Sequence, residues 1–464
     1  MEMNRPFIHL FNNMGNFYLY DVNLNQICRI SKDTYLDLKK LLKDENNFEI
    51  ETKREICKFK NAGLLSDKRP IKLEHPVIKY LPCYLNHRMR HMILQITQDC
   101  NFRCTYCIYS ENANEKQRTH LNKKMDWETA KKAIDFFIQH SSDIMNTCSI
   151  GFYGGEPLLE IKTIKKCVEY IKYEYSAKDI RFNISTNGSL LSDENIEFLL
   201  KYNFLVQISL DATKDINDKN RRLASDGLGT FDMILSNIEK ICSKYTEFLK
   251  NININAVYDP ENDFSVFNKA LYLIENKYHI KVKMGVLDDS YSISKIYYNK
   301  NYTEKYNYEL FLTLLHKLGR LPSYKITPAY NDLLSDVDKL SAIIGVGGEI
   351  VYRGGPCIPA LNRLFISVDG NFYPCEKVSE HSPCMYIGNL DEGFDIKNII
   401  NLLNIGKLTE KQCCNCWAIR YCKICAKHAD GGINLSRELI NKQCFEIKLE
   451  IERIFKYYTL INNI

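Results

Sequence analysis

The chain of 464 residues contains no apolar run that is long enough to span a membrane. Its first residues, MEMNRPFIHLFNN, also lack the basic-then-apolar layout of a secretory signal peptide. The formal net charge is only +5, and there is no basic tail or stripe, which argues against nucleic acid as the main partner. We therefore expect a cytoplasmic protein that binds neither a membrane nor nucleic acid.

Cysteine, in contrast, is abundant, with 18 residues. In a large cytosolic chain, clustered cysteines bind metal more often than they form disulfides. Some cysteines stand singly in periodic apolar segments, and we interpret these as small buried hydrophobic residues. They are Cys28, Cys57, Cys148, Cys167 and Cys242.

The first cysteine cluster follows the apolar, strand-like segment His91–Thr97 and has the spacing C-x3-C-x2-C, at Cys100, Cys104 and Cys107. Three thiolates on one short loop can hold three irons of a 4Fe–4S cubane, which leaves the fourth iron free to bind a small molecule. This spacing, with Tyr106 before the last cysteine, resembles the signature of radical S-adenosylmethionine (SAM) enzymes. The resemblance implies that the three cysteines hold the catalytic, SAM-cleaving cluster and that Tyr106 belongs to the SAM site.

A second motif, Gly154-Gly155-Glu156-Pro157, directly follows the apolar segment Ser149–Tyr153. Glycines at a strand end let the backbone approach a ligand closely, and a carboxylate there can pair with an ammonium group. The motif resembles the GGEP motif of radical SAM enzymes. That resemblance implies that Gly154, Gly155 and Glu156 bind SAM, with Glu156 on its amino group. In an unrelated α/β protein the same residues would form an ordinary turn.

Polar residues end the next two predicted strands as well. The candidate SAM-binding residues there are Ser185, Asn187 and Ser209, and Arg221 follows in the segment after the second of these strands. In radical SAM enzymes with a SPASM domain, the residues matching Ser209 and Arg221 contact the SAM carboxylate, which suits a planar guanidinium. Arg222 competes with Arg221 for this role. Asn187 and Asp211 could instead be turn formers.

The C-terminal region contains a second, longer cysteine array. Its members are Cys357, Cys375, Cys413, Cys416, Cys422, Cys425 and Cys444. The array resembles the seven-cysteine SPASM signature, which implies two auxiliary 4Fe–4S clusters. The cluster nearer the active site would use the proximal cysteines, Cys357, Cys375 and Cys425. The other would use the distal cysteines, Cys413, Cys416, Cys422 and Cys444.

Several features of this array leave alternatives open. The pair Cys422 and Cys425 is spaced C-x2-C where the family has C-x3-C, so the loop that leads to Cys425 is one residue shorter than in the family. Cys384 and Cys414 are spare cysteines that could also be ligands. Zinc is the rival metal, because it also binds paired C-x2-C units.

Residues 86–299 alternate between strand-like and helix-like segments. The predicted strands are His91–Thr97, Ser149–Tyr153, Arg181–Ser185, Leu205–Leu210, Ile252–Tyr258 and Lys281–Val286. Six such units predict an α/β fold with a partial (β/α)6, TIM-like barrel that is too short to close. An open barrel suits a large substrate.

Three further regions flank this radical SAM core. Residues 1–85 predict a few strands and then two helices, which resembles a winged-helix-like peptide-recognition module; a helical cap is the alternative. Residues 300–350 are expected to form a helical linker. Residues 351–464 are expected to form the iron–sulfur (SPASM) domain.

The overall resemblance implies an oxidoreductase that cleaves SAM reductively to a 5′-deoxyadenosyl radical, which abstracts hydrogen from a substrate carbon. Residues 104–110 (CTYCIYS) and 372–378 (FYPCEKV) look most like maturases of cysteine-rich ribosomal peptides, which form thioether crosslinks. Sulfatase-maturing relatives have Asp where this chain has Glu376. The implied cofactors are SAM and three 4Fe–4S clusters. The implied partners are a cysteine-rich precursor peptide and a reductant such as flavodoxin or ferredoxin.

Other functions fit the same motifs. The alternative enzymatic functions are carbon–carbon crosslinking, epimerisation of a residue and sulfatase maturation. Outside catalysis, the chain could be an iron–sulfur carrier or a zinc scaffold. The open three-cysteine site and Glu156 argue against these non-catalytic functions.

Overall fold

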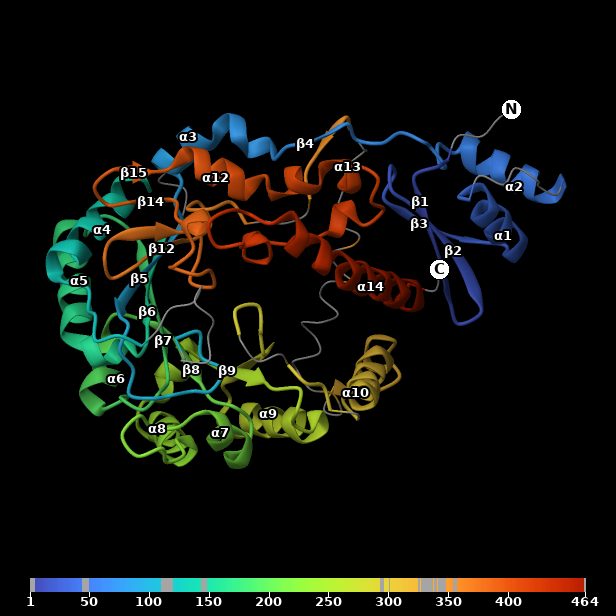
Figure 1. Ribbon diagram of the computed structural model, residues 1–464. Coiled ribbons are helices and arrows are strands. Elements are labelled where there is room, and N and C mark those ends of the chain that lie inside the picture. The colour runs from blue at the N-terminus through green and yellow to red at the C-terminus, as the bar shows by residue number, and fades with distance from the viewer. Residues whose placement is uncertain are drawn as a thin grey trace.

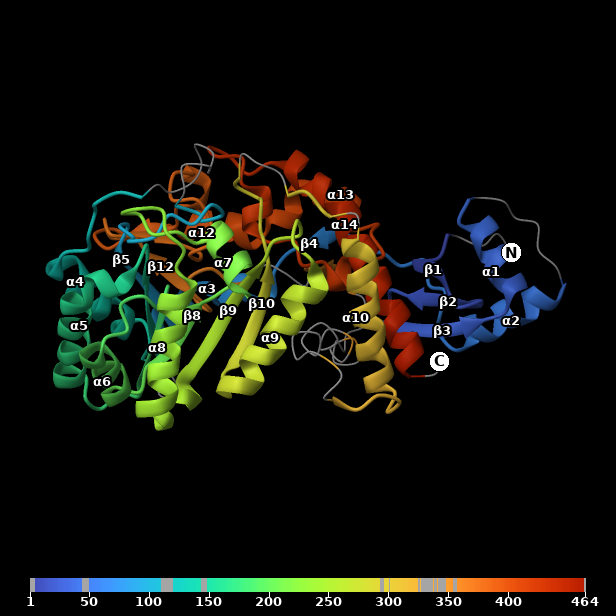
Figure 2. The same cartoon turned by 90° about the horizontal axis from the view of Figure 1, so that it is seen from below.

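The computed structural model describes most of the chain. The described residues are 5–43, 50–109, 120–142, 148–292, 296–299, 301–323, 326, 337, 340, 348–353 and 357–462. They form an elongated molecule with the N-terminal residues at one end and the main sheet at the other (Figures 1 and 2). No helix among these residues is long and apolar enough to cross a membrane.

The N-terminal residues form an antiparallel meander followed by two helices, as the sequence predicts. The elements are β1 (Ile8–Asn13), β2 (Asn16–Asp21), β3 (Gln26–Ile30), α1 (Lys32–Leu41) and α2 (Ile50–Asn61). Ser31 caps α1 through its hydroxyl, which accepts a hydrogen bond from the Thr34 amide. Gly63 has φ +85, the left-handed conformation that glycine adopts most easily after a helix.

The N-terminal sheet packs against the last helix of the chain, α14 (Arg437–Ile461) (Figure 1). The ring of Phe455 on α14 lies 4.6 Å from that of Tyr20 and 5.9 Å from that of Phe11, between ring centroids. The Asn13 side-chain amide donates to the Lys456 carbonyl at 2.8 Å. The N-terminal residues are therefore attached to the C-terminal region, although the two lie at opposite ends of the sequence.

The core of the molecule is a parallel sheet, and all six predicted strands are confirmed. In sequence order they are β5 (His91–Thr97), β6 (Cys148–Gly154), β7 (Ile180–Thr186), β8 (Leu205–Ser209), β9 (Ile252–Tyr258) and β10 (Lys281–Val286). Each strand pairs in parallel with the next. Since all six run in one direction, their carboxyl ends meet at one edge of the sheet, where the predicted SAM motifs lie.

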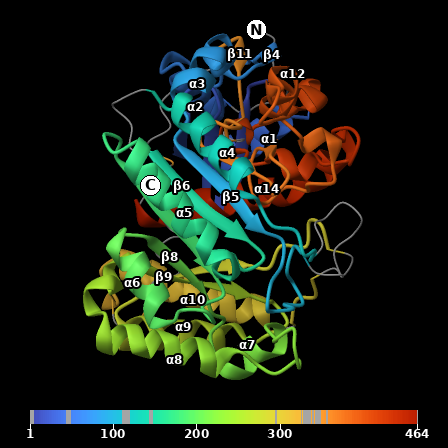
Figure 3. The same cartoon turned by 90° about the vertical axis from the view of Figure 1, so that its left-hand side faces the viewer.

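Amphipathic helices cover the outer face of this sheet, as expected for βα units (Figures 1 and 3). They are α4 (Trp127–Gln139), α5 (Ile161–Glu174), α6 (Asp193–Lys201), α8 (Phe231–Lys244) and α9 (Phe264–Tyr278), with the short α7 (Lys214–Asn220) between strands β8 and β9. Strand β9 shows the pattern that results, with every second side chain buried. The partial-barrel prediction is confirmed.

The C-terminal region extends this same sheet, which the sequence did not predict. Strand β12 (Leu364–Ile366) pairs in parallel with β5. Three short antiparallel strands then follow, β13 (Asn371–Tyr373), β14 (Gly388–Asn389) and β15 (Gly393–Phe394). The edge of the core next to the first cysteine motif is therefore joined directly to the auxiliary-cysteine region.

The remaining elements connect these parts. They include β4 (Lys72–Leu73), α3 (Leu81–His87), α10 (Tyr302–Lys317), β11 (Ile350–Val351), α12 (Ile396–Leu403) and α13 (Glu410–Cys413). Helix α10 packs against both α9 and α14. It lies in the predicted helical linker, but much of residues 318–350 falls outside the described residues.

The prediction for the single cysteines is wrong at one position. Cys148 and Cys167 are buried, and Cys28 and Cys242 are partly buried, but Cys57 is exposed. Cys57 lies on α2, where the neighbouring Ile56 occupies the buried face of the helix.

Candidate active site

The cysteine loop (residues 100–107) leaves the end of β5 and is held by the chain segment that follows α7. The Arg103 amide donates to the Arg222 carbonyl at 2.8 Å, and the Thr105 amide donates to the Asn220 carbonyl at 3.0 Å. Cys100 is buried, and the other two cysteines of the loop are half-buried. Burial raises the pKa of the Cys100 thiol, and the two neighbouring thiols raise it further, so the structure brings the three cysteines together.

Gly154 and Gly155 lie where β6 ends against the start of the cysteine loop. Gly154 has φ +145, and a Cβ atom there would lie 2.0 Å from the Thr97 carbonyl oxygen. A Cβ atom at Gly155 would lie 2.1 Å from the Asp99 carbonyl oxygen. Glycine is therefore needed at both positions for the loop to pack against the strand end, whatever ligand binds nearby.

Glu156 is completely buried at the same strand end. Its Oε1 accepts hydrogen bonds from the Thr186 hydroxyl at 2.7 Å and the Leu158 amide at 3.0 Å, and its Oε2 accepts one from the Asn187 amide at 2.7 Å. Burial raises the pKa of this carboxyl to about 7, although the three donors favour the charged form. Among the described residues, no lysine or arginine forms an ion pair with it.

The next two strand ends place their candidates beside the cysteine loop. The Asn187 side-chain amide donates to Asn101 Oδ1 at 2.8 Å and lies 3.9 Å from the Cys100 sulfur. Its Oδ1 accepts from the Ser189 amide at 2.9 Å, so the turn-forming role is also present. Ser185 and Ser209 are half-buried at the ends of β7 and β8.

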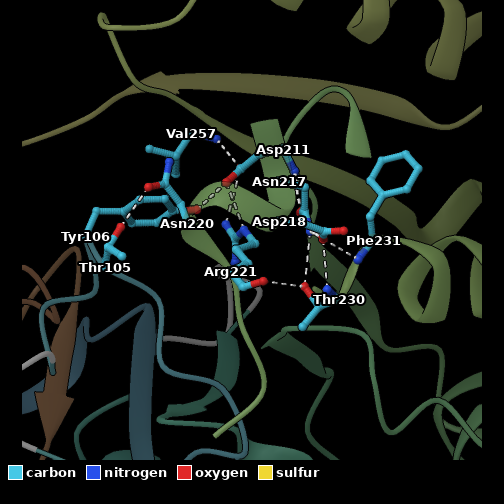
Figure 4. Close-up of polar contacts among 10 residues, drawn as sticks. All are labelled: Thr105, Tyr106, Asp211, Asn217, Asp218, Asn220, Arg221, Thr230, Phe231 and Val257. Atoms are coloured by element: carbon cyan, nitrogen blue, oxygen red, sulfur yellow. Dashed lines mark hydrogen bonds and ion pairs between the residues drawn. The ribbon is translucent and has the colours of Figure 1, made fainter. Parts of the chain in front are cut away.

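Arg221 forms a buried ion pair with Asp211 (Figure 4). Its Nε donates to Asp211 Oδ2 at 2.9 Å and its Nη2 to Oδ1 at 3.3 Å. The Tyr106 hydroxyl donates to the same carboxylate, and the guanidinium lies 5.3 Å from the centre of the Tyr106 ring. Burial raises the pKa of the Cys104 thiol to about 12, and the Arg221 charge opposes that rise. Tyr106 and Arg221 are therefore anchored to each other beside the cysteine loop.

Arg222, the competing candidate, points elsewhere. Its side chain is exposed, and its Nη1 donates to the Gly227 carbonyl at 3.4 Å. Of the two arginines, only Arg221 lies with its guanidinium against the cysteine loop.

A cavity of about 640 Å³, here called the central cavity, opens beside the cysteine loop. Tyr106 and Cys107 form part of its wall, and Tyr291, after β10, forms another part. Glu376 and Lys377, the residues that follow Cys375, also line it. One cavity therefore contacts both the first cysteine motif and the residues that follow Cys375.

The distal cysteines surround a second, very small cavity of about 20 Å³. All four, Cys413, Cys416, Cys422 and Cys444, line it, together with Arg353 and Lys448. The spare Cys414 does not line it, although it lies with Cys413 in the apolar cluster beneath the N-terminal sheet.

The proximal cysteines lie within electrostatic reach of one another. Burial raises the pKa of Cys375 to about 11, with a smaller contribution from Cys425. Burial likewise raises the pKa of Cys425, with a contribution from Cys357. Cys384 is engaged differently, because its thiol donates to Asp430 Oδ1 at 3.4 Å.

The donor sets fit iron–sulfur clusters. Among the described residues, no three Cys, His, Asp or Glu side chains converge closely enough to hold a single metal ion. A cubane distributes its thiolate ligands over several irons, so its cysteines need not converge on one point. Arg353 is buried beside the distal cysteines, and both of its Nη atoms lack a hydrogen-bond partner within the described structure. An unpaired buried cation suits an anionic cluster at that site.

Three residues of these sites were missed by the sequence analysis. Thr186 donates a hydrogen bond to Glu156, Tyr291 lines the central cavity, and Arg353 lines the small cavity surrounded by the distal cysteines. Thr186 lies inside a motif that the sequence did single out, between Ser185 and Asn187. Tyr291 and Arg353 lie in irregular segments, and no local pattern distinguishes them from surface residues.

Comparisons with known proteins agree with this geometry. Residues 94–265 match the family described as the radical SAM superfamily. The chain is 34% identical over 237 residues to the uncharacterized protein MJ0907 of Methanocaldococcus jannaschii, covering 51% of this chain and 73% of that one. It is 28% identical over 301 residues to a cysteine-type anaerobic sulfatase-maturating enzyme of Clostridium novyi, covering 61% and 72%.

A solved structure has the same fold. It is native anSMEcpe with bound AdoMet and the Cp18Cys peptide, which aligns with a TM-score of 0.57 at 22% identity over 80% of this chain and 99% of that one. The family match covers the cysteine loop, the GGEP motif, Asn187 at the end of β7 and Arg221 at the end of α7. The chain therefore belongs to the radical SAM superfamily and is a radical SAM enzyme, with SAM and 4Fe–4S cofactors.

Proposed function

We propose that this enzyme abstracts hydrogen from a ribosomally made, cysteine-rich precursor peptide and forms thioether crosslinks between a cysteine sulfur and a carbon. The central cavity is the observation that carries the proposal. It is lined by Cys107 on one side and by Glu376 and Lys377, next to Cys375, on another. A peptide bound there would touch Cys107 of the cysteine loop and the two residues that directly follow Cys375.

The candidate site residues take the following roles in this proposal. The three cysteines of the cysteine loop hold the SAM-cleaving cluster, which with SAM supplies a radical that can abstract hydrogen from an unactivated carbon. Glu156 binds the SAM ammonium group, and Arg221 and Ser209 face its carboxylate. Because Arg221 already pairs with Asp211, it would be presented to SAM in a fixed orientation. Tyr106 packs its ring against that guanidinium.

The proximal cysteines would hold a cluster with one iron left open to the peptide. Cys384 is the residue that could close this site. Its thiol donates a hydrogen bond to the Asp430 carboxylate, which also accepts a hydrogen bond from the Tyr291 hydroxyl at 2.8 Å. This engagement supports a site with Cys357, Cys375 and Cys425 as its only protein ligands. A peptide thiolate bound there would lie near the reacting carbon.

The proposal divides the chain into a peptide-recognition module (1–85), the radical SAM core (86–299), a helical linker (300–350) and a domain with two auxiliary clusters (351–464). Crosslink formation removes two hydrogens from the peptide. One leaves as the abstracted hydrogen atom and the other as the thiol proton, so one electron must also be accepted. The auxiliary clusters suit that role, and a flavodoxin or ferredoxin would supply the electron that starts each cycle.

Mass spectrometry of a cysteine-rich precursor, incubated with the reconstituted enzyme, SAM and a reductant, tests the proposal. We expect a product lighter by two hydrogens whose cysteine no longer reacts with an alkylating reagent. The same peptide with that cysteine replaced by serine is the control and should not change. Loss of two hydrogens with the thiol still alkylatable would instead indicate a carbon–carbon crosslink. Epimerisation would leave the mass unchanged and would appear as deuterium uptake from D2O.

Sulfatase maturation is the second candidate, favoured by the similarity to the Clostridium novyi enzyme. Glu376 is the position that separates the two candidates. Arg363 Nη1 donates to both of its carboxylate oxygens, at 2.7 and 2.9 Å. The chain thus has a glutamate, committed to pairing with Arg363, where sulfatase-maturing members of the family have Asp, which favours the crosslinking reaction. Turnover of a sulfatase-derived cysteine peptide and none of the precursor would select this second candidate.

A further inference from the structure

Arg353 is a buried arginine with no partner for most of its guanidinium. Its side chain is 4% exposed, and neither Nη1 nor Nη2 makes a hydrogen bond within the described structure. No carboxylate among the described residues pairs with it. Burying an unpaired charge costs several kcal/mol, so such a residue is expected only where a ligand supplies the missing charge.

The missing charge points to the distal cysteines. Arg353 lines the same small cavity as Cys413, Cys416, Cys422 and Cys444. Gly406 packs on its side chain, and a Cβ atom at Gly406 would lie 3.3 Å from Arg353 Nε. The lack of a side chain at Gly406 therefore leaves room for the arginine stem against the cavity wall.

A second cation at this cavity differs in its exposure. Lys448, on α14, also lines the cavity but is half-buried. Water screens a partly exposed charge more strongly than a buried one. The same cavity thus offers a buried and a partly exposed cation for comparison.

We propose that Arg353 is a positioning residue of the distal auxiliary cluster, and that its buried charge makes this cluster easier to reduce. The inference rests on the proposed assignment of the distal cysteines. A cubane with four thiolate ligands is an anion, and reduction adds a further negative charge. A cation held beside it in a low-dielectric environment favours the reduced form. This charge would tune the cluster to accept the electron released during crosslink formation.

The test is potentiometric titration of the full-length protein, followed by electron paramagnetic resonance. Replacing the three cysteines of the cysteine loop by alanine first removes the overlapping signal of the SAM-cleaving cluster. In that background we expect Arg353→Met to disfavour reduction of the distal cluster about tenfold, a fall of about 59 mV in midpoint potential. Arg353→Lys should restore most of the potential. Lys448→Met should lower it by less, and the exposed Arg437→Met should leave it unchanged.

Metal content separates the possible failures. If the background protein contains about eight irons and Arg353→Met has the wild-type potential, the inference is wrong while the cluster assignment stands. If the distal cysteines bind zinc in place of iron, the assignment itself fails, and the inference fails with it. If Arg353→Met loses the cluster, the potential of Arg353→Lys decides. If Arg353→Lys keeps its irons and its midpoint potential equals that of Arg437→Met, the inference is supported. If its midpoint potential is lower by about 59 mV or more although the charge is retained, the inference is overturned.

Discussion

Glu156 offers the most direct test of the SAM site, through the substitution Glu156→Gln. The carboxylate is fully buried and accepts three hydrogen bonds, yet no described cation pairs with it. Glutamine keeps the shape of the side chain and removes its charge. A hydrogen bond to a charged group contributes about 1.5–3 kcal/mol, and each 1.4 kcal/mol corresponds to about tenfold in affinity. We expect the Kd of the reconstituted enzyme for SAM to rise by about 10- to 150-fold.

The pH dependence gives an independent signature of the same contact. Burial raises the pKa of Glu156 to about 7, well above the ordinary value of 4.5. As the pH falls below about 7, more of this carboxyl becomes neutral before SAM binds, so the affinity for SAM should decrease by up to about tenfold per pH unit. The Gln variant has no such group and should lack this part of the profile. The raised pKa also means that the contribution of Glu156 to folding stability is greatest below pH 4.5 and is lost as the pH rises through 7.

Equilibrium SAM binding, measured by isothermal titration calorimetry under anaerobic conditions, checks both expectations. Glu160→Gln is the matched control, because Glu160 lies on the same short helical turn but pairs with Lys124 at 2.5 Å. Its affinity and pH profile should match those of the wild type. An unchanged Kd in Glu156→Gln at intact iron content would refute the ammonium contact, and Glu156 would then be a turn-stabilising residue only.

Three further predictions concern the cysteines and the buried ion pair. Replacing all three cysteines of the cysteine loop by alanine should remove about four irons per chain, retain about eight and abolish 5′-deoxyadenosine formation, as measured by iron assay and chromatography; formation at the wild-type rate would contradict the assignment. Cys384→Ala should keep both iron content and crosslinking, whereas Cys425→Ala should lose iron. Loss of iron in Cys384→Ala would show that Cys384 is a ligand and that the proximal cluster has no open iron. Asp211→Asn should leave Arg221 buried without its counter-charge and lower the free energy of unfolding by about 3–5 kcal/mol. Urea unfolding checks this value, with the exposed Asp226→Asn as control, and a loss as small as that of the control would show that the ion pair is not needed.

The core strands and the SAM motifs could be predicted because their signals are local. Each strand from β5 to β10 is a short segment that is either mostly apolar or alternates apolar with polar residues. Parallel strands joined by helices place their carboxyl ends together, so motifs that lie far apart in sequence converge without further information. The contact between Asn187 and the cysteine loop follows from this topology. The conformation that makes glycine necessary at Gly154 follows from the same strand end.

The join between the core and the auxiliary-cysteine region could not be predicted. Strand β12 has three residues and pairs with β5, from which about 270 residues separate it. A segment this short has no periodicity of its own, and only the partner edge defines it as a strand. The packing of the N-terminal sheet on α14 has the same origin. It depends on aromatic contacts of Phe455 with Tyr20 and Phe11, which no local pattern encodes.

Two buried side chains, Glu156 and Arg353, have no partner of opposite charge among the described residues, and each lies at a site proposed for a bound cofactor. Glu156 is an anion with no described cationic partner, at the site proposed for an ammonium group. Arg353 is a cation with no described anionic partner, among four cysteines proposed to hold an anionic cluster. Each charge would be costly in the protein alone, and each has the sign that its proposed ligand would neutralise. Binding only to the folded state stabilises that state, so the loaded enzyme should resist unfolding more than the polypeptide alone. Because the two sites are separate, loss of SAM and loss of the distal cluster should each remove part of that stability independently.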